Sequence, residues 1–156
     1  MNTEAPDREK LIGKQLRQAT YTVSEVDVAD FLGVVAEPEF ASPVSVDGLA
    51  GAEGGGLAPP SFAPFVAVLG LLKTFDWRED FLVDYQTGTA MFGEQEIEFH
   101  RPLRVGEAVV IDASVHDVYE KQGKKRFDVI DVSFQIDSAT VGDRIMSGRQ
   151  SYILFK

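Results

Sequence analysis

The sequence predicts an α+β domain in which a curved antiparallel sheet wraps around one long apolar helix. The stretch 57–75, LAPPSFAPFVAVLGLLKTF, is apolar at almost every position. From residue 89 onward, apolar and polar residues alternate with the period of two that marks half-buried strands. We therefore expect the helix to be enclosed by the sheet that follows it.

The apolar stretch predicts a helix that starts near Pro60 or Ser61 and ends within 73–75. Proline at the first helical turn loses no hydrogen bond, because its missing N–H would have no partner there. A helix that is apolar on all sides is expected to be buried on all sides. It is too short to span a bilayer, and Pro64 and Gly70 interrupt it.

The elements around this helix follow from local signals. Residues 18–23 predict a short strand, and Ser24 is expected to cap a helix that runs to about Val35. Residues 36–58 are rich in Gly, Pro, Ala and Ser and predict a long loop, functional or mobile. The later strands form an antiparallel meander with one apolar face. The apolar positions of that face are Ile97, Phe99, Val109, Ile111, Ala113, Val115, Ile130, Val132, Phe134 and Ile136.

A bent antiparallel sheet around one apolar helix is the hot-dog architecture. We expect a flexible N-terminus over 1–10 and a single hot-dog domain over 11–156. A single such sheet leaves its edge strands open, so we expect two domains to pair edge to edge into a dimer.

Composition excludes several classes of function. The net charge of −10 argues against a nucleic-acid or anionic-membrane partner. The chain has two histidines and no cysteine, so we expect no metal site and no thiol chemistry. No phosphate-binding glycine loop or GxSxG motif is present, and we expect no cofactor. The first ten residues lack the apolar run of a signal peptide, so we expect a cytoplasmic protein.

The run LAPPSFAPF and the later run EIEFHRPLRVGEAVVIDASVHDVYEKQGKKRFDVIDVSFQI resemble the MaoC-like dehydratase superfamily, closest to its FAS1-like, N-terminal dehydratase subgroup. The pattern F-x-x-P-L-x-x-G-(D/E), from Phe99 to Glu107, is the most specific piece. The segment 12–35 is similar as well. This resemblance implies reversible hydration of a trans-2-enoyl thioester to a (3R)-hydroxyacyl thioester, with coenzyme A or acyl carrier protein as the carrier.

The resemblance also exposes what is missing. Catalytic family members carry an Asp and a His in a loop G-D-x-N-P-x-H, and an oxyanion-binding backbone N–H in an A-H-G sequence at the helix start. The Asp and His positions fall here on Val35 and Phe40, which cannot carry a proton. The glycine position falls on Pro60, which has no N–H. The chain therefore resembles a non-catalytic subunit that pairs with a catalytic MaoC-like one.

Several other residues are candidates for binding. The resemblance implies an acyl tunnel, for which the candidates are Phe62, Phe65, Val66 and Leu69. Arg101, Arg104, Lys124 and Lys125 are candidates for contacts with the phosphates of coenzyme A or with an acidic carrier protein. Lys124 and Lys125 belong to a basic turn with Lys121 and Arg126, which alternatively protects an edge from pairing.

The remaining polar candidates have ordinary interpretations that we favour. His100 and His116 are expected at the surface or in an interface, rather than as a replacement base or, with Asp117, a catalytic dyad. Loop residues are candidates for a variant mechanism but are more simply solvated; they are Glu37, Glu39, Ser45 and Asp47.

Two other functions stay open. A hot-dog thioesterase would need a carboxylate on or just before the buried helix, and 62–72 has no acid. A homodimeric acyl-binding or scaffold protein shares every feature except the catalytic partner.

Overall fold

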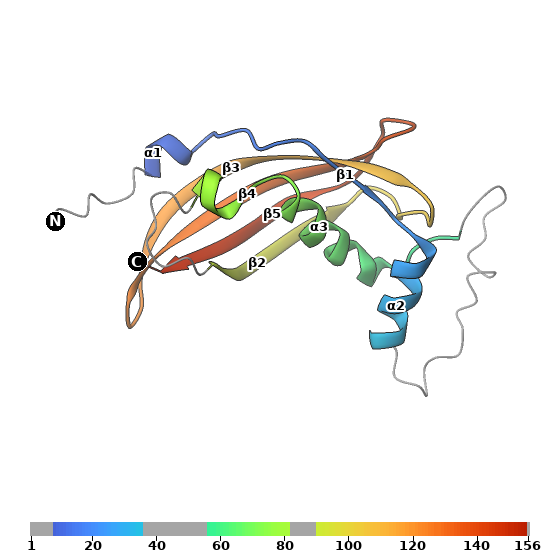
Figure 1. Ribbon diagram of the computed structural model, residues 1–156, viewed down its shortest axis with the longest axis horizontal. Helices are drawn as coiled ribbons and strands as arrows, with labels where there is room; N and C mark the ends of the chain where they lie inside the picture. The colour runs from blue at the N-terminus through green and yellow to red at the C-terminus, as the bar shows by residue number, and fades with distance from the viewer. Residues whose placement is uncertain (1–7, 36–55, 82–89, 156) are drawn as a thin grey trace.

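Long antiparallel strands dominate the computed structural model, which describes residues 8–35, 56–81 and 90–155 (Figure 1). Within these residues, five strands form one sheet in the order β1-β3-β4-β5-β2. The elements in chain order are α1 (Arg8–Leu11), β1 (Ala19–Thr22), α2 (Glu25–Val35), the 3₁₀ turn η2 (Pro60–Phe62), α3 (Ala63–Leu72), the π-helical turn η3 (Trp77–Phe81), β2 (Ala90–Phe99), β3 (Ala108–Gln122), β4 (Arg126–Ser138) and β5 (Arg144–Phe155).

The alternation in the sequence places the core on one face of the central strands. In β3 the predicted inward residues are buried, and so are those of β4. They are Val109, Ile111, Ala113, Val115, Ile130, Val132, Phe134 and Ile136. A bulge between Val115 and Asp117 shifts the pairing of β3 with β4. Bulges increase the local bend of a sheet, which helps it curve over a helix.

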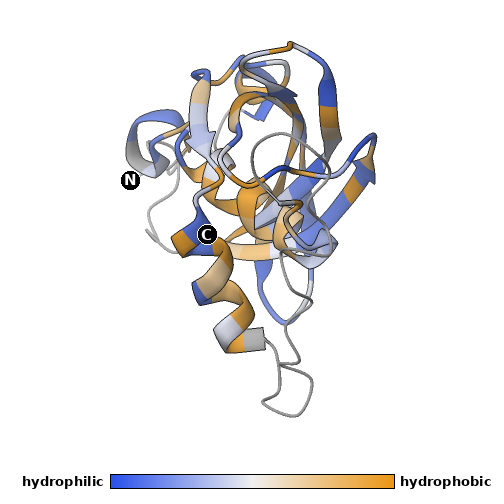
Figure 2. Ribbon diagram, turned by 90° about the vertical axis from the view of Figure 1, so that its right-hand side faces the viewer, coloured by the Kyte–Doolittle hydropathy of each residue, from blue (hydrophilic) through white to orange (hydrophobic). Residues whose placement is uncertain are grey.

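Helix α3 lies on this face, as the sequence predicts (Figure 1). A Cβ added at Gly70 would lie 2.8 Å from Cγ1 of Ile111, so only glycine lets the helix approach β3 this closely. Viewed end-on, hydrophobic residues gather inside the curve of the sheet (Figure 2). The predicted α+β architecture of a sheet wrapped around one helix is therefore confirmed.

The expectation that α3 is buried on all sides is wrong in part. Val66, Ala67 and Leu71 are fully buried, whereas the side chains of Phe65 and Leu72 are 38% and 44% exposed. The reason is geometric: one sheet covers only part of the circumference of a helix.

The edge strand β2 is also more open than the alternation predicts. Ile97 is half-buried and Phe99 is 51% exposed. Phe92 is 50% exposed, although it pairs with the buried Tyr152 of β5. Because β2 is an edge strand of the sheet, part of its helix-facing side extends beyond α3.

Side-chain hydrogen bonds fix the two N-terminal helices, α1 and α2. Ser24 caps α2 as predicted, with its Oγ accepting the Asp27 N–H at 3.0 Å. Residues 8–10 fall in the segment expected to be flexible, yet they form most of α1. There the Arg8 guanidinium bonds the fully buried Asp128 carboxylate at 2.9 and 3.1 Å.

Candidate functional site

The start of α3 is where the resemblance places the reaction site, and backbone pairing fixes it. The Ala58 N–H donates to the Leu103 carbonyl at 2.8 Å, and the Val105 N–H donates to the Gly56 carbonyl at 2.7 Å. Pro59 then has extended geometry and η2 begins at Pro60. The turn between β2 and β3 therefore determines where the helix starts.

A cleft of about 210 Å³ opens beside this helix start. Its lining is mostly apolar, and the described residues that form it include no carboxylate. They are Ala58, Pro59, Pro60, Ala63, Phe99, His100, Arg101, Pro102 and Leu103. Prolines occupy both positions before the first free helical N–H, so this corner of the cleft is poor in backbone donors.

Two of the three motif positions lie among the described residues, and neither carries a proton-transferring side chain. Val35 is the last residue of α2, and Pro60 opens η2. Phe40 lies outside the described residues, as do Glu37, Glu39, Ser45 and Asp47. The expected long loop over 36–58 falls mostly outside as well, and its last residues, 56–58, pair with the 103–105 turn.

His100 lies nearer the cleft than the sequence alone suggests. It is exposed at the cleft rim, and its Nε2 lies 3.2 Å from the Ser147 hydroxyl oxygen. This partner is a hydroxyl and not the carboxylate that commonly orients a catalytic histidine. His116 is exposed on β3, and the neighbouring Asp117 carboxylate accepts its own strand's Val118 N–H at 2.8 Å.

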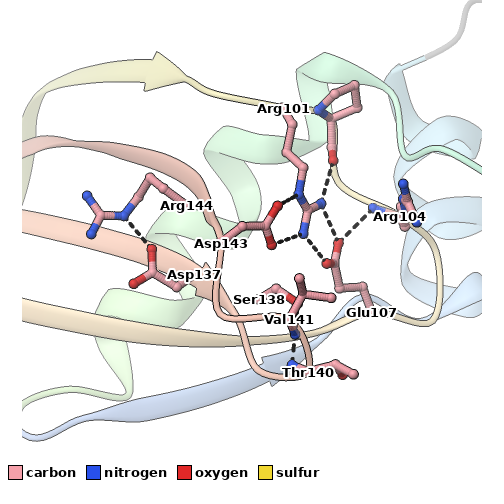
Figure 3. Close-up of polar contacts among 10 residues, drawn as sticks. Arg101, Arg104, Glu107, Asp137, Ser138, Thr140, Val141, Asp143 and Arg144 are labelled. Carbon is pink, nitrogen blue, oxygen red and sulfur yellow. Dashed lines mark hydrogen bonds and ion pairs between the residues drawn. The ribbon is translucent and has the colours of Figure 1, made fainter.

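Arg101 is committed to a structural network (Figure 3). Its Nε and Nη2 donate to Asp143, its Nη1 and Nη2 donate to Glu107, and its Nη1 also donates to the Pro102 carbonyl. These five bonds use all five guanidinium N–H groups. The contact of Arg101 with a carrier phosphate stays a prediction, and it would require Arg101 to exchange one of these bonds.

This network ties the turn after β2 to the turn between β4 and β5. Glu107 also accepts the Arg104 N–H at 3.1 Å. Although burial opposes it, the bond from Arg101 lowers the pKa of Glu107 below its ordinary value. The same guanidinium lowers the pKa of Asp143, and both carboxylates raise the pKa of Arg101. The charged forms hold both turns together beside the cleft.

The other cationic candidates lie at opposite ends of the sheet. Arg104 is exposed in the turn that precedes β3, next to the cleft. Lys124 and Lys125 are exposed in the turn after β3, and the 15-residue length of that strand separates them from Arg104. The structure therefore does not gather the predicted carrier contacts into one patch.

The acyl-tunnel candidates divide into core and surface residues. Phe62 and Val66 are fully buried, whereas Phe65 is exposed and Leu69 is half-buried. Phe62 and Phe65 pack against each other and against Phe31 of α2, with ring centroids 5.3 to 6.0 Å apart.

Sequence reasoning missed the polar chain on the inner face of β2 and β5. The Gln95 amide donates to the Gln150 amide oxygen at 2.8 Å, and the Gln150 amide donates to the Tyr152 hydroxyl at 2.6 Å. Gln95 follows the alternation of Ile97 and Phe99, and a bulge between Phe92 and Gln95 lets Phe92 share that inner face. Gly93, in the middle of an alternating strand, was the available signal.

Two general classes of site find no support in the part of the chain that the structure describes. Among residues 8–35, 56–81 and 90–155, no cluster of His, Asp and Glu could hold a metal ion. None of the helices in these ranges combines the length and hydropathy of a bilayer-spanning segment.

A single apolar helix held in the curve of an antiparallel sheet defines a hot-dog domain. Residues 10–147 match the family described as FAS1-like, dehydratase domain region. The chain belongs to this family, and its fold is that of MaoC-like hot-dog proteins. Comparison with curated protein sequences gave no match.

Solved structures with the same fold include both dehydratases and hydratases. The (3R)-hydroxyacyl-ACP dehydratase complex HadBC of Mycobacterium tuberculosis is 20% identical with a TM-score of 0.64, covering 92% of this chain and 96% of that chain. The ChsH1-ChsH2 complex of the same organism is 17% identical with a TM-score of 0.63, covering 90% and 82%. An (R)-hydratase of A. caviae is 15% identical with a TM-score of 0.58, covering 93% and 96%.

Proposed function

We propose that the chain is the non-catalytic subunit of a heteromeric (3R)-hydroxyacyl-thioester dehydratase. Its partner would be a MaoC-like subunit that carries the catalytic Asp and His. The pair would interconvert a (3R)-hydroxyacyl thioester and a trans-2-enoyl thioester. The observation that carries this proposal is the start of α3, where the cleft offers prolines in place of a donor and no carboxylate among its described lining residues.

The chemistry explains why this cleft is a poor active site. Hydration of an enoyl thioester needs a base for water, an acid for the α-carbon and donors for the thioester oxygen. Among the described residues that line the cleft, only the His100 side chain could act as a base, and no described carboxylate bonds it. The five guanidinium N–H groups of Arg101 are bonded to Glu107, Asp143 and the Pro102 carbonyl, so none is free for an oxyanion.

Exposed apolar residues support pairing through the open side of the domain. Phe65 and Leu72 of α3 and Phe92 and Phe99 of β2 are each 38 to 51% exposed. Clusters of large exposed apolar side chains mark interaction surfaces. We propose edge-to-edge pairing through β2, which would cover Phe92 and Phe99 of that strand. That two of the solved relatives are described as complexes, HadBC and ChsH1-ChsH2, supports a partner of the same fold.

In such a pair, the basic turn that contains Lys124 and Lys125 would lie beside the active site of the partner. Ala90 pairs with Leu154, and Phe155 pairs with Phe127, so the start of β2, the end of β5 and the turn at 123–125 share one end of the sheet. Antiparallel pairing through β2 sets this end beside the helix start of the partner. Lys124 and Lys125 would meet the phosphates of coenzyme A or an acidic acyl carrier protein there.

The acyl group would lie against the exposed side of α3, where Phe65 and Leu69 reach the surface. We further propose that the complex works in the cytoplasm and needs no cofactor, because thioester hydration is acid–base chemistry.

Reconstitution tests this proposal. The purified chain is assayed for hydration of trans-2-enoyl-CoA alone and together with a MaoC-like catalytic subunit, such as one encoded beside it. We expect turnover only for the mixture, and its loss when the catalytic Asp of the partner is replaced by Asn. Turnover by this chain alone would refute the proposal. Hydrolysis of acyl-CoA by this chain would instead identify a thioesterase.

A further inference from the structure

The edge strand β2 has two contrasting faces. Its inner face carries Phe92, Gln95, Ile97 and Phe99, which pair with inward residues of β5 or extend past α3. Its outer face carries Glu96 and Glu98, which line a hollow on the outside of the sheet together with Asp112, Arg144 and Arg149. Both glutamates are exposed.

A third carboxylate joins this acidic row at the bulge. The Glu94 N–H donates to the Ser151 hydroxyl at 2.7 Å, and the Glu94 side chain is exposed. It lies close enough to the outer-face Asp131 to contribute to the raised pKa of that carboxyl, which is due first to burial. Arg149 forms an ion pair with this row of carboxylates: its Nη2 lies 3.4 Å from the Glu96 carboxylate, and both side chains are more than half exposed. An exposed pair of this length neutralises little.

We infer that this charge row makes β2 select a partner other than a second copy of this chain, namely a hot-dog chain whose own edge strand carries Lys or Arg on its outer face. The inference rests on the proposed pairing through β2. It adds the chemistry of the partner, which the apolar inner face alone does not specify.

The argument is one of register. When two antiparallel strands pair, outer residues lie opposite outer residues. In a symmetric pairing centred on Glu96, Glu94 of each copy would face Glu98 of the other, and the two copies of Glu96 would face each other. Shifting the centre to Glu98 still leaves two glutamates opposed. Like charges directly opposite on neighbouring strands are destabilising, whereas opposite charges are favourable.

The inner face favours pairing with any hot-dog chain, so the outer face decides which one. Phe92 and Phe99 would gain burial against either a copy or a different chain. Discrimination between similar partners requires a repulsive element against the wrong one as well as attraction to the right one. The three glutamates supply the repulsion, and cations at the facing positions would convert it into attraction.

Two variants of β2 and their association in solution test this inference. The first is Glu94→Gln/Glu96→Gln/Glu98→Gln, which removes the charge and keeps the shape. The second is Glu94→Lys/Glu96→Lys/Glu98→Lys, which supplies the proposed partner chemistry. Self-association of each variant and of an equimolar mixture of wild type with the Lys variant is measured by sedimentation velocity at low and high salt.

We expect the Gln variant to self-associate at least tenfold more tightly than wild type at low salt, with the difference shrinking as salt is added. We expect wild type and the Lys variant to form a one-to-one dimer at least tenfold tighter than either forms alone. Equal self-association of wild type and the Gln variant would overturn the inference. So would a mixture that behaves as the sum of its two components.

Two controls separate this inference from the proposed function. Glu9→Lys/Asp30→Lys/Glu79→Lys makes the same charge change on exposed residues away from β2 and should behave as wild type. Phe99→Glu should abolish the mixed dimer. If Phe99→Glu leaves that dimer intact, association does not use β2, and the proposed edge-to-edge pairing fails with the inference. If wild type forms a tight homodimer that Phe99→Glu disrupts, the inference fails, while the missing catalytic groups still support the proposed function.

Discussion

Gly148 of β5 lies directly against the backbone of Glu96 in β2. Glu96 pairs with Arg149, the residue that follows Gly148. A Cβ on Gly148 would be 1.9 Å from the Glu96 carbonyl oxygen, a backbone atom that cannot rotate away. The two strands approach this closely along the edge through which we propose that the domain pairs. The identity of residue 148 therefore controls whether β2 stays attached to the sheet.

Gly148→Ala should separate β2 from β5 around Glu96 and lower the free energy of unfolding by about 3 kcal/mol. Urea denaturation measures the loss, and hydrogen exchange should show faster exchange of β2 amides than of β3 amides. Gly123→Ala is the matched control, because a Cβ there meets its nearest atom at 3.4 Å, on the Phe127 ring. Equal stability of the two variants would contradict the close approach.

The network of Arg101 predicts a pH-dependent stability. The pKa of Glu107 is lowered in the fold from its ordinary value of 4.5, so the charged pair stabilises the protein above that pH and is lost as pH falls through the lowered folded pKa. Arg101→Met should lower the free energy of unfolding at pH 7 by about 1–2 kcal/mol through its bond to Glu107. The difference from wild type should shrink toward pH 3.

Urea denaturation at a series of pH values measures this effect. Arg126→Met serves as the control, since Arg126 is exposed in the basic turn and its Nε bonds the Gln122 amide oxygen. If Arg101→Met lowers the free energy of unfolding equally at pH 3 and pH 7, the loss does not come from the ionic bond to Glu107.

For Asp131 we predict a pH dependence of stability with the opposite sign. Burial, and then the charges of Asp117 directly opposite and of Glu94, raise its pKa above the ordinary 3.8, outweighing Arg149 and His116. An acid with a raised folded pKa costs stability above that pKa and costs nothing below the unfolded pKa, where both states hold a neutral carboxyl. Asp131→Asn should therefore gain about 0.5–1 kcal/mol at pH 7 and nothing at pH 3.

Thermal or urea unfolding at the two pH values distinguishes this gain from a general effect of removing a negative charge. The exposed Glu9→Gln variant lowers the net charge equally and should change stability at neither pH. A gain in Asp131→Asn that persists at pH 3 would contradict the electrostatic cause.

The cationic candidates predict different effects on carrier binding. In the proposed heterodimer, Lys124→Ser/Lys125→Ser should weaken the binding of an enoyl-CoA about tenfold and reduce its salt dependence, because the turn lies at the end of the sheet nearest the partner's helix start. Arg104→Ser, which removes one positive charge at the other end of the sheet, should change binding less than twofold. Calorimetry with the assembled complex measures both, and the reverse order would place the carrier at this chain's own cleft.

The sheet and the central helix could be predicted because their signals are local. The alternation in β3 and β4 is regular, and the helix of 57–75 has prolines in its first turn where they fit. The exposure of Phe65, Leu72 and Phe99 could not be predicted, because it depends on how far one sheet reaches around a helix. The pattern of apolar and polar residues does not show how far the sheet extends around the helix.

The absence of catalytic groups at the three motif positions stays a prediction from residue types, whereas the contacts around the cleft could be seen only in the structure. The side chains of Val35 and Phe40 cannot transfer a proton, and Pro60 has no backbone N–H to donate. The five bonds of Arg101 could not be foreseen, because Asp143 is 42 residues away in sequence. The bulge between Phe92 and Gln95 could not be foreseen in detail, because it places the Glu94 N–H on the Ser151 hydroxyl of the neighbouring strand.

The measurement that tests the account most directly is the hydration rate of trans-2-enoyl-CoA by the purified chain, with and without a MaoC-like catalytic subunit. We predict a rate equal to the uncatalysed one for the chain alone and enzymatic turnover for the one-to-one complex. Turnover by the chain alone that disappears in His100→Ala would contradict the account, because it would place a working base at the cleft beside α3.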